Sequence, residues 1–88
     1  MSNNLYVLVR IEDGEIRVEH FDRLEYAQQY ILDEYFAIYN SDSHSKYVRR
    51  NISDDKMSAY YDRYYFDGRS MDVNAIQWEI FSIDLDAE

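Results

Sequence analysis

Hydrophobic and polar residues alternate in two short runs near the start of the chain, and the tetrad Glu12-Asp13-Gly14-Glu15 joins them. Asp-Gly tolerates the positive φ angles that a type I′ turn requires. The pattern therefore predicts a β-hairpin over residues 5–20 with Asp13 and Gly14 as its loop residues. This register makes one side of the ribbon almost wholly apolar. Its cross-strand pairs are Ile11 with Ile16, Val9 with Val18, and Val7 with His20.

The other side of the predicted hairpin places Arg10 opposite Arg17. Like charges directly opposite one another destabilise an antiparallel pair. We therefore expect nearby carboxylates to screen the two guanidinium groups, and the candidates are Glu12, Glu15 and Glu19. This side is predicted to be a solvated face, with a contact site as the alternative.

The residues after the hairpin carry the signals of a helix start. Asp22 can act as the N-cap, and Glu25 stands three residues further on, as in a capping box. Phe21 and Tyr26 can form a hydrophobic staple around this cap. Helical spacing then predicts a helix over residues 22–39. Its core stripe is Leu24, Ala27, Ile31, Tyr35 and Ile38, and its outward face carries Tyr26, Gln29, Tyr30 and Asp33.

Turn-forming residues fill the next segment, so we expect a polar loop over residues 40–52. Ser53 then precedes Asp54 and Asp55, which suit a helix N-terminus. The pattern predicts a short second helix over residues 54–66, ending before Gly68. One face of that helix would carry Met57, Tyr60, Tyr61 and Tyr64.

Alternation returns near the C-terminus and predicts a strand over residues 75–85, followed by an acidic tail over 86–88. Strict alternation would send the strand's two apolar sets to opposite faces. A bulge near Ile80 and Phe81 would let both sets reach the core. The two sets are Ile76, Trp78 and Ile80, and Phe81, Ile83 and Leu85.

These elements predict one α+β domain spanning residues 1–88, with the chain order β-β-α-α-β. The last strand is expected to join the hairpin, because a two-stranded sheet alone is marginally stable. The result would be a three-stranded antiparallel sheet covered on one face by the helices.

Composition bounds the chemistry of this chain. It has 88 residues, no Cys and two Gly, so thiolate metal sites, disulfides and Gly-rich phosphate loops are excluded. A chain this short leaves little room for a substrate cleft beside its core. His20 and His44 stand in no metal-binding spacing, and the paired carboxylates carry no calcium-loop pattern. We expect no enzyme activity, no cofactor and no metal.

The first residues show neither a signal peptide nor a membrane-spanning segment, because Arg10 interrupts the apolar run. The expected location is therefore the cytoplasm, without membrane association. A formal net charge of −9 disfavours direct binding to nucleic acid, which needs Lys and Arg to neutralise phosphates. A local basic cluster stands beside Tyr47, and it could contact a phosphate, an acidic partner or, as we expect, carboxylates of the helix or tail. Its members are Lys46, Arg49 and Arg50.

Ten tyrosines exceed what a core of this size needs, so many are expected at the surface. Tyrosine concentrates binding energy at protein interfaces, and carboxylates around it would suit a basic groove. The alternative is a tyrosine-rich core with acids present for solubility. The candidate partner-binding residues are Glu12, Asp13, Glu15, Glu19, Tyr26, Tyr30, Asp33, Glu34, Asp84 and Asp86.

In size, acidity and tyrosine content the chain resembles small phage-encoded inhibitors of bacterial defence, the anti-CRISPR and anti-restriction DNA mimics. The resemblance implies a stoichiometric inhibitor without cofactor in the host cytoplasm, and its partner would be a CRISPR effector or a restriction enzyme. The chain itself predicts an acidic protein that occupies a basic, nucleic-acid-binding surface of a larger protein. Reversing Asp33 and Glu34 to lysine should then abolish binding and leave the fold intact. The alternative is an interaction module or small subunit that uses a tyrosine-rich face, homodimerisation included.

Overall fold

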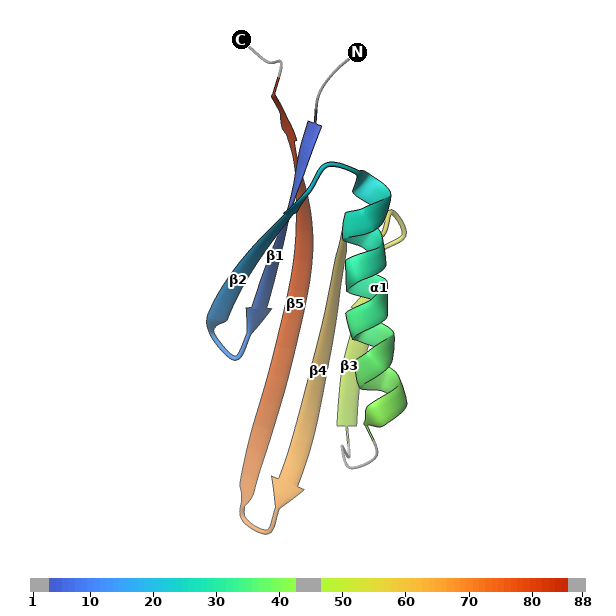
Figure 1. Ribbon diagram of the computed structural model, residues 1–88. Coiled ribbons are helices and arrows are strands. Elements are labelled where there is room, and N and C mark those ends of the chain that lie inside the picture. Colours follow the sequence, from blue (N-terminus) through green and yellow to red (C-terminus); the bar gives the residue numbers. More distant parts are fainter. Residues whose placement is uncertain (1–3, 43–46, 86–88) are drawn as a thin grey trace.

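The computed structural model describes residues 4–42 and 47–85, and it contains one helix and one five-stranded antiparallel sheet (Figure 1). The strands lie in the spatial order β2-β1-β5-β4-β3. The molecule is elongated, with principal extents of 57 × 23 × 17 Å. The elements are β1 (Asn4–Glu12), β2 (Glu15–Phe21), α1 (Leu24–Ser41), β3 (Tyr47–Ile52), β4 (Ser58–Asp67) and β5 (Ser70–Asp84).

The predicted hairpin and its register are confirmed. Ile11 pairs with Ile16, and Arg10 pairs with Arg17. The backbone φ angles of Asp13 and Gly14 are +50° and +89°, the left-handed values that a type I′ turn needs at both loop positions. The Asp-Gly pair therefore sets both the turn and the side of the ribbon on which each residue lies.

The predicted helix is also present, displaced by two residues at each end. Arg23 rather than Asp22 occupies the N-cap position, and its side chain makes no capping hydrogen bond. Phe21 packs against Tyr30 instead of Tyr26, with ring centroids 5.9 Å apart. The core stripe is confirmed, since its members are buried or partly buried against the sheet: Leu24, Ala27, Ile31, Tyr35 and Ile38.

The prediction of a second helix is wrong. The segment expected to form a helix over residues 54–66 holds the end of a loop and most of β4, and the predicted polar loop contains β3. Ser53 does not cap a helix; its hydroxyl accepts hydrogen bonds from the backbone N–H of Met57 and of Ser58, closing the β3–β4 connection. The tyrosines alternate as in a strand, because Tyr61 is buried and Tyr60 faces the other way.

The predicted three-stranded sheet is therefore wrong as well. β3, β4 and β5 form a meander, and β5 joins it to the hairpin by pairing with β1 on its other side. β5 begins at Ser70, five residues before the predicted start, and Gly68 lies in the tight β4–β5 turn with a φ of +61°. The chain order is β-β-α-β-β-β, so β5 is the central strand of the sheet.

β5 passes through Ile80 and Phe81 without the expected bulge. Ile80 pairs with Leu8, Phe81 pairs with Val7, and the register continues unbroken to Asp84. Strict alternation therefore holds, so Ile80 faces α1 and Phe81 faces the opposite side.

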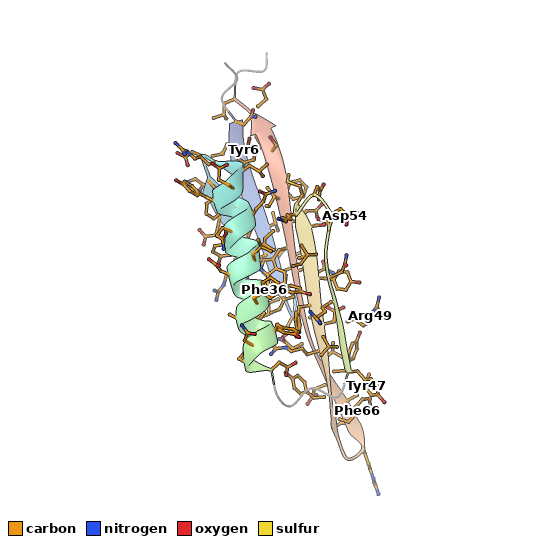
Figure 2. The ribbon with its side chains drawn as sticks, turned by 90° about the vertical axis from the view of Figure 1, so that its right-hand side faces the viewer. Tyr6, Phe36, Tyr47, Arg49, Asp54 and Phe66 are labelled. Carbon is orange, nitrogen blue, oxygen red and sulfur yellow. The ribbon has the colours of Figure 1, made fainter. Side chains whose placement is uncertain are left out.

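The core lies entirely between α1 and one face of the sheet. Figure 2 shows α1 along one side only, with the labelled Arg49 projecting from the other. The buried residues come from α1 and from alternate positions of β1, β4 and β5: Leu8, Ala27, Ile31, Tyr35, Ala59, Tyr61, Ile76, Trp78 and Ile80.

One comparison on β5 tests this one-sided core. Ile76 faces α1 and is 1% exposed, whereas Val73 lies on the opposite face and is 44% exposed. We expect Ile76→Ala to lower the free energy of unfolding by about 2 to 4 kcal/mol, because it opens a cavity, and Val73→Ala to lower it by no more than about 1 kcal/mol. Urea denaturation of both variants measures the difference, and equal losses would contradict a one-sided core.

Candidate protein-binding surfaces

A charged group sits where α1 meets the sheet. Glu34 on α1 accepts a hydrogen bond from Arg10 Nε on β1 at 3.0 Å and another from Trp78 Nε1 on β5 at 3.1 Å. Arg10 Nη1 also contacts Glu12 Oε1 at 3.1 Å. Arg10 is thus paired by Glu34, a residue distant in sequence, as well as by the expected Glu12. These contacts hold the helix over β1 and β5.

Glu12 and Asp13 bind the hairpin turn to β5. Asn74 Nδ2 donates hydrogen bonds to Glu12 Oε2 at 3.2 Å and to Asp13 Oδ2 at 2.7 Å. Asp13 also accepts a hydrogen bond from the Ala75 backbone N–H at 3.0 Å. The hydrogen bond from Asn74 lowers the pKa of Glu12, with a smaller contribution from Arg10. For Asp13, the Ala75 N–H is the largest cause of a lowered pKa and Asn74 is the second. Glu12 and Asp13 therefore have structural partners.

The remaining predicted residues of the hairpin and helix form one surface, here called the acidic edge. It consists of Glu15 and Glu19 on β2 with Tyr26, Tyr30, Asp33 and Glu34 on α1. Glu15 and Glu19 lie on the side of β2 that faces α1, as their pairing with Glu12 and Leu8 requires. On α1, Tyr30 and Glu34 lie on the flank that contacts Phe21 and Arg10, and Tyr26 and Asp33 lie beside them on the solvent side of the helix.

Tyr30 joins the two halves of the acidic edge. Its ring rests on Phe21 at the end of β2, and its hydroxyl lies in a negative environment. Burial raises the pKa of the Tyr30 hydroxyl, and the charges of Glu34 and Glu19 raise it further. Tyr30 is thus half-buried, in contrast to the outward position predicted for it, while Tyr26 and Asp33 are exposed as expected.

Other predicted residues lie apart from this edge. Asp84 pairs in register with Asn4 at the end of β5, two strands away from β2. Asp86 and Lys46 lie outside the described residues. Arg49 and Arg50 are separated because they point to opposite faces of β3. The guanidinium of Arg50 lies 4.3 Å from the ring centroid of Tyr39, and it donates a hydrogen bond to the Tyr35 hydroxyl at 3.4 Å.

A second surface is the side of the sheet opposite α1, here called the open face. Sequence reasoning missed it, because the side of the hairpin that carries Arg10 and Arg17 was predicted to be the solvated face. That prediction is wrong, since this side faces α1 and Arg10 contacts Glu34 there. Ile16 and Val18 are 65% and 60% exposed there, and Phe81 is 47% exposed. The apolar patch of the open face spans β2, β1 and β5, and it consists of Val7, Val9, Ile11, Ile16, Val18, Phe81 and Ile83.

The tyrosines divide between the two sides of the sheet. Tyr35 and Tyr61 are buried beneath α1, with ring centroids 5.2 Å apart. Tyr47, Tyr60 and Tyr64 belong to the open face of β3 and β4. Figure 2 shows Tyr47 beside Phe66, and their ring centroids are 5.6 Å apart. Some tyrosines are therefore part of the core and others lie at the surface.

Comparison with known proteins found no matching family model, no matching curated protein and no matching solved structure. Across residues 4–42 and 47–85, the acidic and histidine side chains form no group able to hold a metal ion. In the same ranges, no helix has the length and apolarity needed to cross a bilayer. The surfaces described above are thus the basis for any functional conclusion.

The Asn74 contacts predict a specific pH dependence. Glu12 and Asp13 have folded-state pKa values below their ordinary values, which are about 4.3 and 3.9. As the pH falls, the unfolded state therefore takes up protons before the folded state does. The contribution of Glu12 and Asp13 to the free energy of unfolding is present above about pH 4.3, and it is lost as the pH falls through their lowered folded-state pKa values. Between about pH 7 and about pH 3, we expect the free energy of unfolding to fall less in Asn74→Ala than in the parent protein.

Urea denaturation at a series of pH values measures this effect. Asn51→Ala on the open face of β3 is the matched control, because it removes an exposed asparagine far from both acids. It should keep the parent's pH dependence. The assignment is refuted if Asn74→Ala and Asn51→Ala titrate alike.

Proposed function

We propose that this chain is a small non-enzymatic binding protein whose acidic edge docks against a positively charged surface of a larger protein. The observation that supports this proposal is that β2 and α1, separated in sequence by a loop, bring four carboxylates and two tyrosines onto one edge of the fold. In the same proposal, the positively charged surface of the larger protein otherwise binds nucleic acid. By occupying that surface, this chain acts as an inhibitor in the cytoplasm.

The arrangement of the acids fits this role. Glu15 and Glu19 lie on the same side of one strand, four residues and so roughly 13 Å apart. Asp33 and Glu34 add charge from a second element. Opposite charge would speed encounter with a basic surface, and a well-packed tyrosine would slow release. Tyr26, which is exposed on α1, is the residue best placed to fill a gap between basic side chains.

Arg17 interrupts the acidic row. It lies between Glu15 and Glu19 on the side of β2 that faces α1, and it makes no ion pair among the described residues. A basic partner would be repelled by this guanidinium. Arg17 therefore lowers the affinity for a basic partner and offers a gain-of-binding test.

A second candidate function is favoured by the open face. The patch of valine, isoleucine and phenylalanine could bind a protein partner without any mimicry of nucleic acid, as an interaction module or small subunit. Salt distinguishes the two functions, because ionic contacts are screened and apolar contacts are not. The two surfaces lie on opposite sides of the sheet, so variants can separate them.

The test of the proposed function is affinity capture from a nuclease-treated bacterial lysate, followed by binding measurements with the purified captured protein. We expect a nucleic-acid-binding enzyme whose affinity falls about ten-fold or more between about 50 and 300 mM NaCl. Glu15→Lys with Glu19→Lys should abolish this binding, and Arg17→Gln should strengthen it. Glu34 is left unchanged because it anchors Arg10 and Trp78, so its reversal would not leave the fold intact.

The matched control is Asp54→Lys with Asp72→Lys, which changes the net charge by the same amount at two exposed positions outside the acidic edge. This control should retain binding. If both double variants lose binding equally, only net charge matters and the acidic edge is not the site. Binding that withstands high salt and the reversal of Glu15 and Glu19 would contradict the proposal.

A further inference from the structure

Antiparallel sheets commonly leave one face in water, and that face is then polar. The open face instead carries an apolar patch, and no element covers it among residues 4–42 and 47–85. Domains bury an apolar sheet face against another element, and α1 covers only one side here. Two stacked sheets lie about 10 Å apart with their side chains interdigitated. We propose that a second copy of this chain supplies the missing layer, so that two open faces pack together as a two-fold symmetric sandwich.

The distribution of charge selects a second copy as the occupant. The chain carries a net charge of −9, so two copies repel each other over most of their surface. The strand positions of the open face carry only two acids, Glu79 and Asp62, with Arg49 beside Asp62 in register. Within the apolar patch there is none. Two acidic copies can therefore approach through this face and not through the acidic edge.

A basic partner would be drawn elsewhere. Its charge is attracted to the acidic edge, which lies on the α1 side of β2, whereas the apolar patch offers no carboxylate to steer it. The patch is therefore left for a partner chosen by shape and apolar contact. A two-fold arrangement meets this requirement because the same apolar side chains face one another across the axis.

The available area suits a weak dimer. The three strands of the apolar patch, spaced about 4.8 Å apart and some seven residues long, give roughly 14 × 23 Å, or on the order of 330 Å² of flat sheet. Interfaces that bury less than about 1,200 Å² in total are typical of weak, transient association. The patch also borders a hollow of about 440 Å³ between β1, β5 and β4, whose walls include Val9, Tyr60 and Phe81. Glu79 also lines this hollow, at the margin of the proposed interface.

Glu79 lies at the margin of the proposed interface. It is exposed on β5 and pairs in register with Val9 of the apolar patch and with Ser58 on β4, so it stands where the patch ends. Packing centred on β1 and β2 leaves Glu79 at the rim, where water still reaches it. The acidic edges of both copies remain on the outside, so the dimer does not compete with the proposed function.

Sedimentation equilibrium of the full chain tests the proposal between about 1 and about 200 μM, the range of a micromolar dimer. We expect the mass to rise from the 10.7 kDa monomer toward twice that value. Rising salt should leave the association unchanged or strengthen it, because the apolar contact is not screened and the repulsion is. A monomer at all these concentrations would overturn the proposal, even if it binds lipid vesicles or another protein.

Ile16→Lys with Val18→Lys should raise the dissociation constant of the dimer about ten-fold or more. Both side chains are exposed, so the fold is retained, as circular dichroism would verify. The variant is also two charges less negative, so a weaker dimer cannot result from a larger net charge. Tyr26→Lys on α1 is the control with the same type of change and should dimerise normally. A folded Ile16→Lys/Val18→Lys variant that dimerises like the parent would overturn the proposal.

Cross-linking gives a second measurement that does not depend on weakening the dimer. The chain has no cysteine, so a single Val18→Cys or Tyr26→Cys substitution provides one reactive thiol. A bismaleimide spanning about 10 Å should join two copies of the Val18→Cys variant, because stacked sheets lie at that separation. It should not join two copies of the Tyr26→Cys variant, whose thiol lies on α1. Equal cross-linking of the two variants would refute the face-to-face arrangement.

Discussion

Side-chain alternation along β1 and β5 couples the two faces of the sheet, because every residue placed beneath α1 sends its neighbours to the opposite side. Trp78 and Leu8 are fully buried under the helix, so Phe81 and Val9 must face away. One helix covers one face of the sheet, and the other face keeps its valines and isoleucines in the open. The core, the exposed patch and the position of the acidic edge all follow from this constraint.

Local signals predicted the hairpin and the first helix well. The Asp13-Gly14 turn encodes its own register, and helical spacing identified Ala27, Ile31 and Tyr35 as core. The second half of the chain was predicted poorly for a physical reason. Tyr60, Tyr61 and Tyr64 fit helical spacing, and only pairing with β3 and β5 makes the segment a strand. Such pairing involves residues distant in sequence, which a local pattern does not contain.

The candidate site shows the same division. Glu15, Glu19 and Asp33 were identified from charge alone, and the fold gathers them on one edge. The sequence did not reveal that Glu34 anchors Arg10 and Trp78, or that Asn74 holds Glu12 and Asp13. The open face could have been recognised, since β1 and β5 both carry apolar residues on both sides and few helical residues are available to cover them. The expectation of a bulge at Ile80 and Phe81 concealed this signal.

The central claim is that a second copy covers the open face, and its most direct test is an isotope-filtered NMR experiment on a mixture of labelled and unlabelled chains. The account predicts intermolecular nuclear Overhauser effects that connect the methyl groups of Val9 and Val18 of one copy with open-face side chains of the other. Intermolecular contacts that involve Tyr26 and the α1 surface instead, or none at concentrations where the dimer is expected, would contradict it.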